Sequence, residues 1–199
     1  MLRCDEPRER IMTTTARRPR KRWTYADYCR IPADRLIHEI IDGRHFSHPA
    51  PSIRHQRVRG WLMYELMNLL HASDRGTVLG CRIDLHLGPC TIVQPDVVVM
   101  LRRTRSIIGD KKLTGVPDLI AEVLSPEYRE YDCRIKLERY QRAGVPEFWI
   151  VDADGELLEQ YTSRHGVYGP PAVHRERVQL CGLRDSVINL REVWSRASR

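Results

Sequence analysis

The chain has 199 residues, of which 42% are hydrophobic and 30% are charged, a balance typical of a soluble globular protein with one domain and a buried core. Its apolar runs are far too short to span a bilayer, and no secretory signal is visible, so we expect a cytoplasmic protein with no membrane partner. The net charge of +7 favours a polyanionic partner but does not indicate a fold.

Much of the excess positive charge lies in residues 1–22, which contain the run RRPRKR. This segment has no hydrophobic periodicity, so we predict a disordered basic tail there. The folded domain is then expected over residues 23–195, with a short C-terminal tail at 196–199. For the basic run, the alternative to a solvated tail is an arm that binds nucleic acid.

The six cysteines form neither a C-x-x-C pair nor a cluster with zinc-ligand spacing. Because no export signal is visible, we expect reduced thiols. Cys81 and Cys90 flank a predicted hairpin and could approach each other, but we expect free thiols at both positions.

The N-terminal half is expected to contain a short helix after Thr24, a hairpin that turns at Asp42-Gly43, and a long helix over residues 54–72. The long helix is amphipathic, because its apolar residues recur on one side at intervals of three and four: Val58, Trp61, Leu62, Leu66, Leu69 and Leu70. Two strands should follow. Residues 81–87 alternate apolar and polar, and residues 92–101 are more uniformly apolar, as in a central strand.

The C-terminal half is expected to continue with strands around one more helix. The predicted elements are a basic loop or irregular helix over 102–115, a central strand over 118–124, a helix over 129–144 that ends at Gly144, and strands over 147–152 and 156–163 that pair across Asp154-Gly155. A strand and a short helix should complete the domain. The whole pattern indicates a mixed β-sheet flanked by helices, that is, a single α/β (α+β) domain.

The strand over 118–124 carries a carboxylate near its centre. Glu122 shares a face with Ile120 and Leu124, so it leaves water if helices cover both faces of the sheet. An unpaired buried carboxylate would be strongly unfavourable or would take up a proton, so a cation or hydrogen-bond donors should lie beside it. A structural ion pair with an arginine is the alternative to a functional site.

Asp96 raises the same question one strand earlier, where it follows Pro95 and opens a strongly apolar run. Two carboxylates at equivalent depths on neighbouring strands can jointly hold a divalent ion, and hard oxygen ligands suit Mg²⁺ or Mn²⁺. Taken alone, Asp96 could instead be a hydrogen-bonding residue at the start of a strand.

Lys136 lies mid-way along the helix predicted over 129–144, on one stripe with Asp132 and Tyr140. A lysine at the border of a buried face can reach over the sheet edge and place its ammonium group beside a metal site. There it would orient an attacking water or offset charge that develops on a phosphate. Taken alone, Lys136 could be an exposed helix lysine with Asp132 as its partner.

These segments together resemble the bacterial Uma-two family of restriction endonucleases, which belongs to the PD-(D/E)XK nuclease superfamily. The similarity runs from about Trp23 to Trp194, and the segments that carry it keep the family's order: EIIDG, VQPDVVV, PDLIAEVLSP and DCRIKLERYQRAGVPEFWIVD. The resemblance implies a restriction-endonuclease-like fold and a Mg²⁺-dependent (or Mn²⁺-dependent) endonuclease. Its implied partner is a nucleic acid, with DNA as the leading candidate.

The resemblance also assigns the central site residues. It places the metal-binding acids at Asp96 and Glu122. In the wider superfamily a lysine stands two residues after the second acid, a position that Leu124 occupies here. The Uma-two family takes its lysine from the following helix, which matches Lys136.

Two further positions match the family. Glu39 corresponds to an N-terminal acid that can complete the metal shell, although it could also be a solvent-facing residue beside the hairpin. His55 corresponds to a histidine that often opens the next helix, where it could also cap that helix or lie beside a phosphate. The chain departs from the family at Arg44, where a glutamate is usual, and in the segment SPEY.

Three functions are compatible with the sequence. The leading one is a metal-dependent endonuclease, the second is a nuclease-fold DNA-binding module that does not cleave, and the third is a structural or regulatory protein with an ion-pair core. A homodimer is compatible with the first, because cutting both strands commonly uses two sites, but no interface motif is visible.

Overall fold

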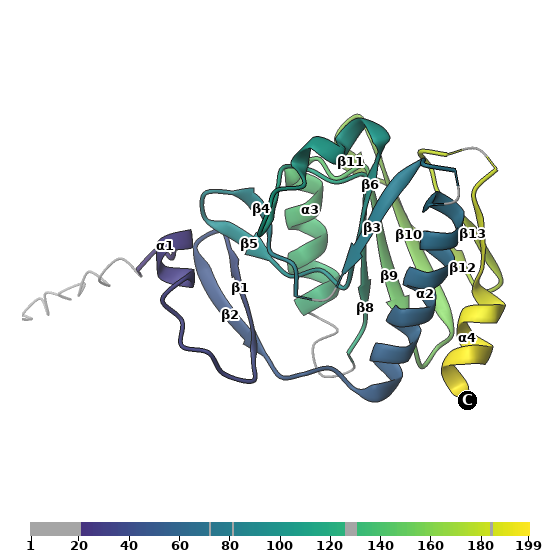
Figure 1. Cartoon of the computed structure of the whole chain (residues 1–199), viewed down its shortest axis with the longest axis horizontal. Coiled ribbons are helices and arrows are strands. Elements are labelled where there is room, and N and C mark those ends of the chain that lie inside the picture. The colour runs from purple at the N-terminus through teal and green to yellow at the C-terminus, as the bar shows by residue number, and fades with distance from the viewer. Residues whose placement is uncertain (1–20, 72, 81, 126–130, 184) are drawn as a thin grey trace, which may run out of the picture.

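The computed structural model describes residues 21–71, 73–80, 82–125, 131–183 and 185–199 (Figure 1). The predicted basic tail therefore lies outside the described residues, except for Lys21 and Arg22. Within the described part, every helix is too short or too polar to cross a membrane.

A seven-stranded mixed sheet forms the centre of the molecule, in the order β11-β10-β9-β8-β6-β3, with β12 paired to β10. Its strands β8 and β9 run parallel, and the other pairs are antiparallel. The strands are β3 (Gly76–Gly80), β6 (Val97–Leu101), β8 (Leu119–Val123), β9 (Glu147–Asp152), β10 (Leu157–Arg164), β11 (Val167–Tyr168) and β12 (Ala172–His174).

Helices cover both faces of this sheet, as predicted. On one face, α2 (Ile53–His71) and α4 (Leu190–Ser198) lie side by side (Figure 1), and their apolar residues pack on Val97, Val99 and Ala121. On the other face, α3 (Leu137–Ala143) packs through Tyr140. The predicted fold class, a mixed sheet flanked by helices, is confirmed.

A second sheet, in the order β2-β1-β5-β4-β7, shares the α3-side core. It contains β1 (Ile37–Ile41), β2 (Arg44–His48), β4 (Leu85–Gly88), β5 (Thr91–Val93) and β7 (Leu113–Thr114). The remaining elements are α1 (Tyr25–Tyr28), a 3-10 helix η1 (Arg102–Ile107), a π-helical turn η3 (Tyr131–Lys136), and the strand pair β13 (Arg177–Gln179) and β14 (Val187–Asn189). Most of the predicted elements are therefore present.

The local signals for turns and helix ends are confirmed. Thr24 caps α1, and Asp42 and Gly43 have φ angles of 50° and 77°, which are the left-handed values of a tight hairpin turn. The helix after β8 ends at Gly144, whose φ of 81° suits a residue without a side chain, although its first part is π-helical.

Two strand predictions are wrong. The single strand expected over 92–101 is split into β5 and β6, which belong to different sheets, because Pro95 cannot donate to a strand ladder and the chain crosses between the sheets there. The strand expected over 81–87 begins at Leu85, since Arg82 has a φ of 57° that no strand allows. Cys81 lies outside the described residues, and Cys90 is a free thiol.

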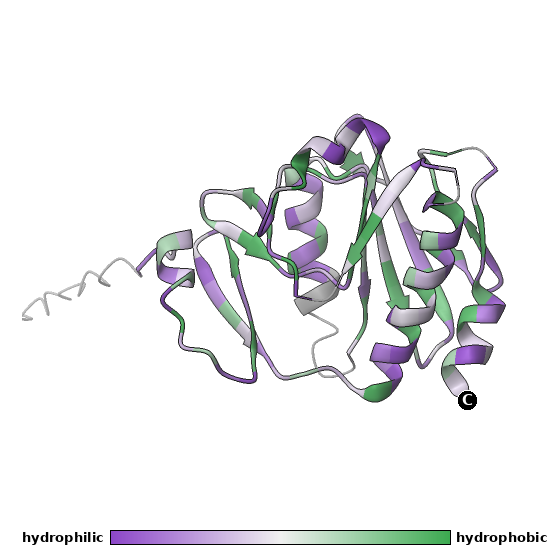
Figure 2. Cartoon of the chain, viewed as in Figure 1, coloured by the Kyte–Doolittle hydropathy of each residue, from purple (hydrophilic) through white to green (hydrophobic). Residues whose placement is uncertain are grey.

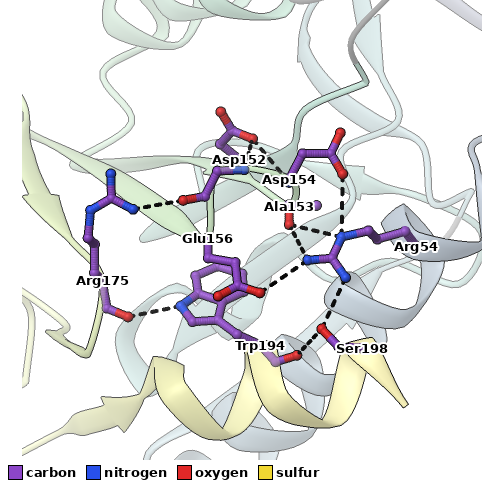
Figure 3. Close-up of polar contacts among 9 residues, drawn as sticks. Arg54, Asp152, Ala153, Asp154, Glu156, Arg175, Trp194 and Ser198 are labelled. Atoms are coloured by element: carbon purple, nitrogen blue, oxygen red, sulfur yellow. Dashed lines mark hydrogen bonds and ion pairs between the residues drawn. The ribbon is translucent and has the colours of Figure 1, made fainter.

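Arg54 ties the first turn of α2 to two distant segments (Figure 3). Its Nε and Nη2 donate to the Ala153 carbonyl at 3.1 and 2.8 Å, and its Nη1 donates to Ser198 Oγ at 3.1 Å. Asp154 and Glu156 add ion pairs at 3.4 and 3.3 Å. Since α4 continues to Ser198, the packed region extends past residue 195.

Replacing Arg54 with lysine should lower the free energy of unfolding by about 1–2 kcal/mol, because an ammonium group cannot reproduce the two-pronged contact with a carbonyl. The matched control is Arg177→Lys, at an exposed arginine on β13, which should change stability by less than about 0.5 kcal/mol. Urea unfolding followed by circular dichroism would measure both. Equal effects of the two substitutions would contradict a specific role for Arg54.

Candidate active site

A cavity of about 270 Å³ lies where the two sheets meet the N-terminal end of α2. The five residues predicted from the sequence all line it: Glu39, His55, Asp96, Glu122 and Lys136. The rest of its described wall includes the loop Pro49-Ala50-Pro51, Gln94 and His48. Side chains from distant parts of the chain therefore converge on one hollow.

The pairing of strands explains why the two acids meet. Val97 on β6 lies opposite Ala121 on β8 in an antiparallel register. Extending that register by one residue brings Asp96 beside Glu122, at the point where Pro95 ends the ladder. The break that split the predicted strand is thus the feature that places Asp96 at the cavity.

Lys136 is buried between two carboxylates. Its Nζ lies 3.0 Å from Glu122 Oε1 and 3.1 Å from Glu39 Oε1, and only 4% of the residue is exposed. The alternative of an exposed helix lysine is therefore wrong, and the cation beside Glu122 is not an arginine. The side chain of Asp132, its alternative partner, lies outside the described residues.

Glu122 has a second partner, Tyr140, which lies on the same helix stripe as Lys136. The hydroxyl of Tyr140 donates to Glu122 Oε1 at 2.7 Å. Burial raises the pKa of Tyr140 well above its ordinary value of 10.0, and the charge of Glu122 raises it further, so the phenol remains a donor. The signal in the sequence was the spacing of four residues between Lys136 and Tyr140.

Glu39 is buried on β1 with 1% exposed, so the alternative of a solvent-facing residue is wrong. Besides Lys136, its carboxylate accepts the Gln94 backbone N–H at 2.8 Å and lies 3.4 Å from His48 Nε2. Burial acts to raise the pKa of Glu39, but the ammonium group of Lys136, the nearby His48 imidazole and the hydrogen bond from Gln94 outweigh it and lower the pKa from 4.5 to about 2. His48 and Gln94 were not foreseen from the sequence.

The lowered pKa predicts acid sensitivity. Because the folded pKa of Glu39 is below the unfolded one, the ionised group contributes stability that is complete above pH 4.5 and is lost as the pH falls toward about 2. Glu39→Gln should reduce the stability at neutral pH and flatten its decline over this range. Urea midpoints measured in EDTA at successive pH values would test this, and an unchanged pH dependence in the variant would contradict it.

Asp96 is held from two sides. Its Oδ2 accepts the Val123 backbone N–H at 2.9 Å and lies 3.0 Å from His55 Nε2, while Arg59 Nη1 lies 3.9 Å from its Oδ1. His55 sits in the first turn of α2, and its backbone N–H donates to Ser52 Oγ, so Ser52 rather than His55 caps the helix. The His55 imidazole is buried, and its Nδ1 has no partner in the described part of the chain.

The profile of the Uma2 family, described as "Putative restriction endonuclease", matches residues 25–187. The chain belongs to the Uma2 family. The resemblance seen in the sequence is therefore confirmed over most of the domain. The comparison with curated proteins finds no match.

A solved structure has the same fold. It is a protein from Anabaena variabilis ATCC 29413 described as "a putative nuclease belonging to DUF820", and it superposes on this Uma2 chain with a TM-score of 0.71 at 15% sequence identity. The match covers 88% of this chain and 99% of the other. At this level of identity the likeness shows the fold.

Proposed function

We propose that this Uma2 protein is a divalent-metal-dependent endonuclease that hydrolyses phosphodiester bonds in DNA. The observation that carries the proposal is the cavity, in which a buried lysine and three carboxylates from separate elements converge. A pure ion-pair core would need no hollow beside its charges, whereas a hydrolytic site needs space for a water and a phosphate.

The charges of the cavity fit a divalent cation. Its described wall holds the carboxylates of Glu39, Asp96 and Glu122 against the ammonium of Lys136, and with Arg59 beside Asp96 one negative charge remains in excess when the histidines are neutral. Among the described residues, no group of three or more His, Cys, Asp and Glu side chains is arranged to hold a metal. Asp96 and Glu122 would therefore hold Mg²⁺ or Mn²⁺ with oxygens of backbone, water and substrate, as Mg²⁺ commonly binds.

The bound ion would lower the pKa of a coordinated water and offset negative charge in the transition state. Lys136 would orient the attacking water and stabilise charge on the phosphate, and Glu39 keeps its amine in place through the 3.1 Å contact. His55 would fix the Asp96 carboxylate, and Tyr140 would fix that of Glu122. Each of these contacts thus holds in place one of the three proposed catalytic side chains, Lys136, Asp96 and Glu122.

The substrate follows from charge. The net charge of +7 favours a polyanionic substrate. Nucleic acids are the polyanions whose backbone is built from phosphodiester bonds. DNA is the first substrate to test.

The test is incubation of supercoiled plasmid with the purified protein in Mg²⁺ or Mn²⁺ and in EDTA. We expect nicked and linear products with the metals and none with EDTA. Binding of metal and DNA without any cleavage would overturn the nuclease proposal and favour a binding module that does not cleave.

A further inference from the structure

Three large apolar side chains lie on the face that α2 presents to solvent. Its exposed positions follow one stripe: Ile53, Arg57, Gly60, Tyr64, Met67, Asn68 and His71. Ile53 is 80% exposed, Tyr64 47% and Met67 38%. The outer face of a surface helix normally carries charged residues, yet this one carries a single arginine in a chain that is 30% charged. In Figure 2, the first turns of α2 are largely purple, and white and green predominate further along the helix.

This stripe is additional to the core of the protein. The opposite side of α2, which carries Val58, Leu62 and Leu66, is already buried against the sheet and α4. Tyr64 rests edge-on against the ring of Trp61, with centroids 5.5 Å apart, so its ring is held in place and still faces outward. Exposed tyrosine, methionine and arginine are the residues enriched in protein interfaces.

The stripe is self-complementary about Gly60. Ile53 and Met67 lie seven residues before and after it, and Arg57 and Tyr64 lie three before and four after. In an antiparallel pair of α2 helices that cross at Gly60, Ile53 of each copy meets Met67 of the other. The guanidinium of Arg57 in each copy then lies against the Tyr64 ring of the other, which is a favourable cation–π contact. A Cβ atom added at Gly60 would contact nothing within 4 Å, so the crossing point is open to a close approach.

We infer that the occupant of this face is a second copy of the chain, in a two-fold homodimer through α2. A pair of identical surfaces can match only if the residues of one surface complement each other across an axis, and the Gly60 stripe meets that condition. The N-terminal end of the described chain is an unsuitable occupant, because α1 lies at the opposite end of the molecule from α2 (Figure 1).

The dimer also predicts how the proposed nuclease would act on a DNA duplex, and this prediction rests on the proposed function. His55, which lines the cavity, is five residues before Gly60, so the two copies of His55 lie about 7–8 Å along the helix from the crossing point, on opposite sides of it. Two sites related by a two-fold axis match the two antiparallel strands of a DNA duplex, which share that symmetry. The dimer therefore predicts cleavage of both strands of a duplex.

Light scattering during size-exclusion chromatography tests the dimer independently of any nuclease activity. The measured mass of the full-length protein should be twice the 23.3 kDa of one chain. Each of the substitutions Met67→Glu and Tyr64→Glu should lower the measured mass to that of one chain. Val173→Glu is the matched control, since Val173 is 59% exposed on β12, and it should remain dimeric. A parent protein that is monomeric up to its solubility limit, or a dimer that survives both α2 substitutions, would overturn the inference.

Cross-linking locates the axis. Gly60→Cys should form a covalent dimer with a short bis-maleimide, because the two introduced thiols face each other, whereas Gly169→Cys, also in open space, should cross-link no more than the parent. Equal yields for the two variants would contradict an axis at Gly60. If the parent protein is dimeric but does not cleave DNA, the nuclease proposal alone would be rejected.

Discussion

Replacing Lys136 with methionine is expected to reduce metal-dependent DNA cleavage by about 10²–10³-fold, the usual effect of removing one group that stabilises transition-state charge. The same change should lower the free energy of unfolding by about 3–5 kcal/mol, because it leaves Glu39 and Glu122 buried without their shared cation. Loss of activity in this variant alone would therefore be ambiguous. Cleavage rates and urea unfolding must be measured together.

The double variant Glu39→Gln/Lys136→Met separates the two effects. Removing one of the two carboxylates should restore much of the lost stability, since the remaining one, Glu122, keeps the hydrogen bond from Tyr140. Activity should stay low, because the amine is still missing. A double variant that regains both stability and cleavage would show that Lys136 acts only through folding.

Asp96→Asn is the second substitution with a large expected effect. The asparagine amide keeps the size of the side chain and can still accept the Val123 N–H, so we expect the fold to persist. Its lost charge should weaken Mn²⁺ binding by more than about 10-fold and reduce cleavage by about 10²–10³-fold. Asp110→Asn, at an exposed aspartate, is the matched control and should change neither.

Calorimetric titration with Mn²⁺ and plasmid cleavage would provide the two readouts for Asp96→Asn. Because a structural role predicts changed stability with unchanged metal affinity, the calorimetry separates the two roles. Parent-like Mn²⁺ affinity in this variant would remove Asp96 from the proposed metal site.

The sequence predicted the parts of the fold that depend on local chemistry. Asp42-Gly43 indicated a hairpin turn, and Gly144 indicated the end of a helix, because few residues tolerate a positive φ. The apolar stripe of α2 predicted a helix, since a buried face needs that spacing. The short strand β3 escaped notice because its sequence, GTVLG, has two glycines and no alternation.

The candidate site was predictable in its charged residues and not in their partners. A carboxylate within an apolar strand needs a cation or hydrogen-bond donors, and Glu122 has both in Lys136 and Tyr140. The contacts of His48 and Gln94 with Glu39 depend on how two sheets meet, and no pattern along the chain encodes that arrangement. The pairing of His55 with Asp96 depends in the same way on packing between α2 and β6.

Anomalous diffraction from a crystal soaked in Mn²⁺ is the most direct measurement of whether the cavity is a metal-dependent hydrolytic site. We expect one peak within coordination distance of both the Asp96 and Glu122 carboxylates, with the Lys136 amine beside it and no peak in crystals of Asp96→Asn. A Mn²⁺ peak elsewhere on the molecule, with none at this cavity, would contradict the proposed chemistry.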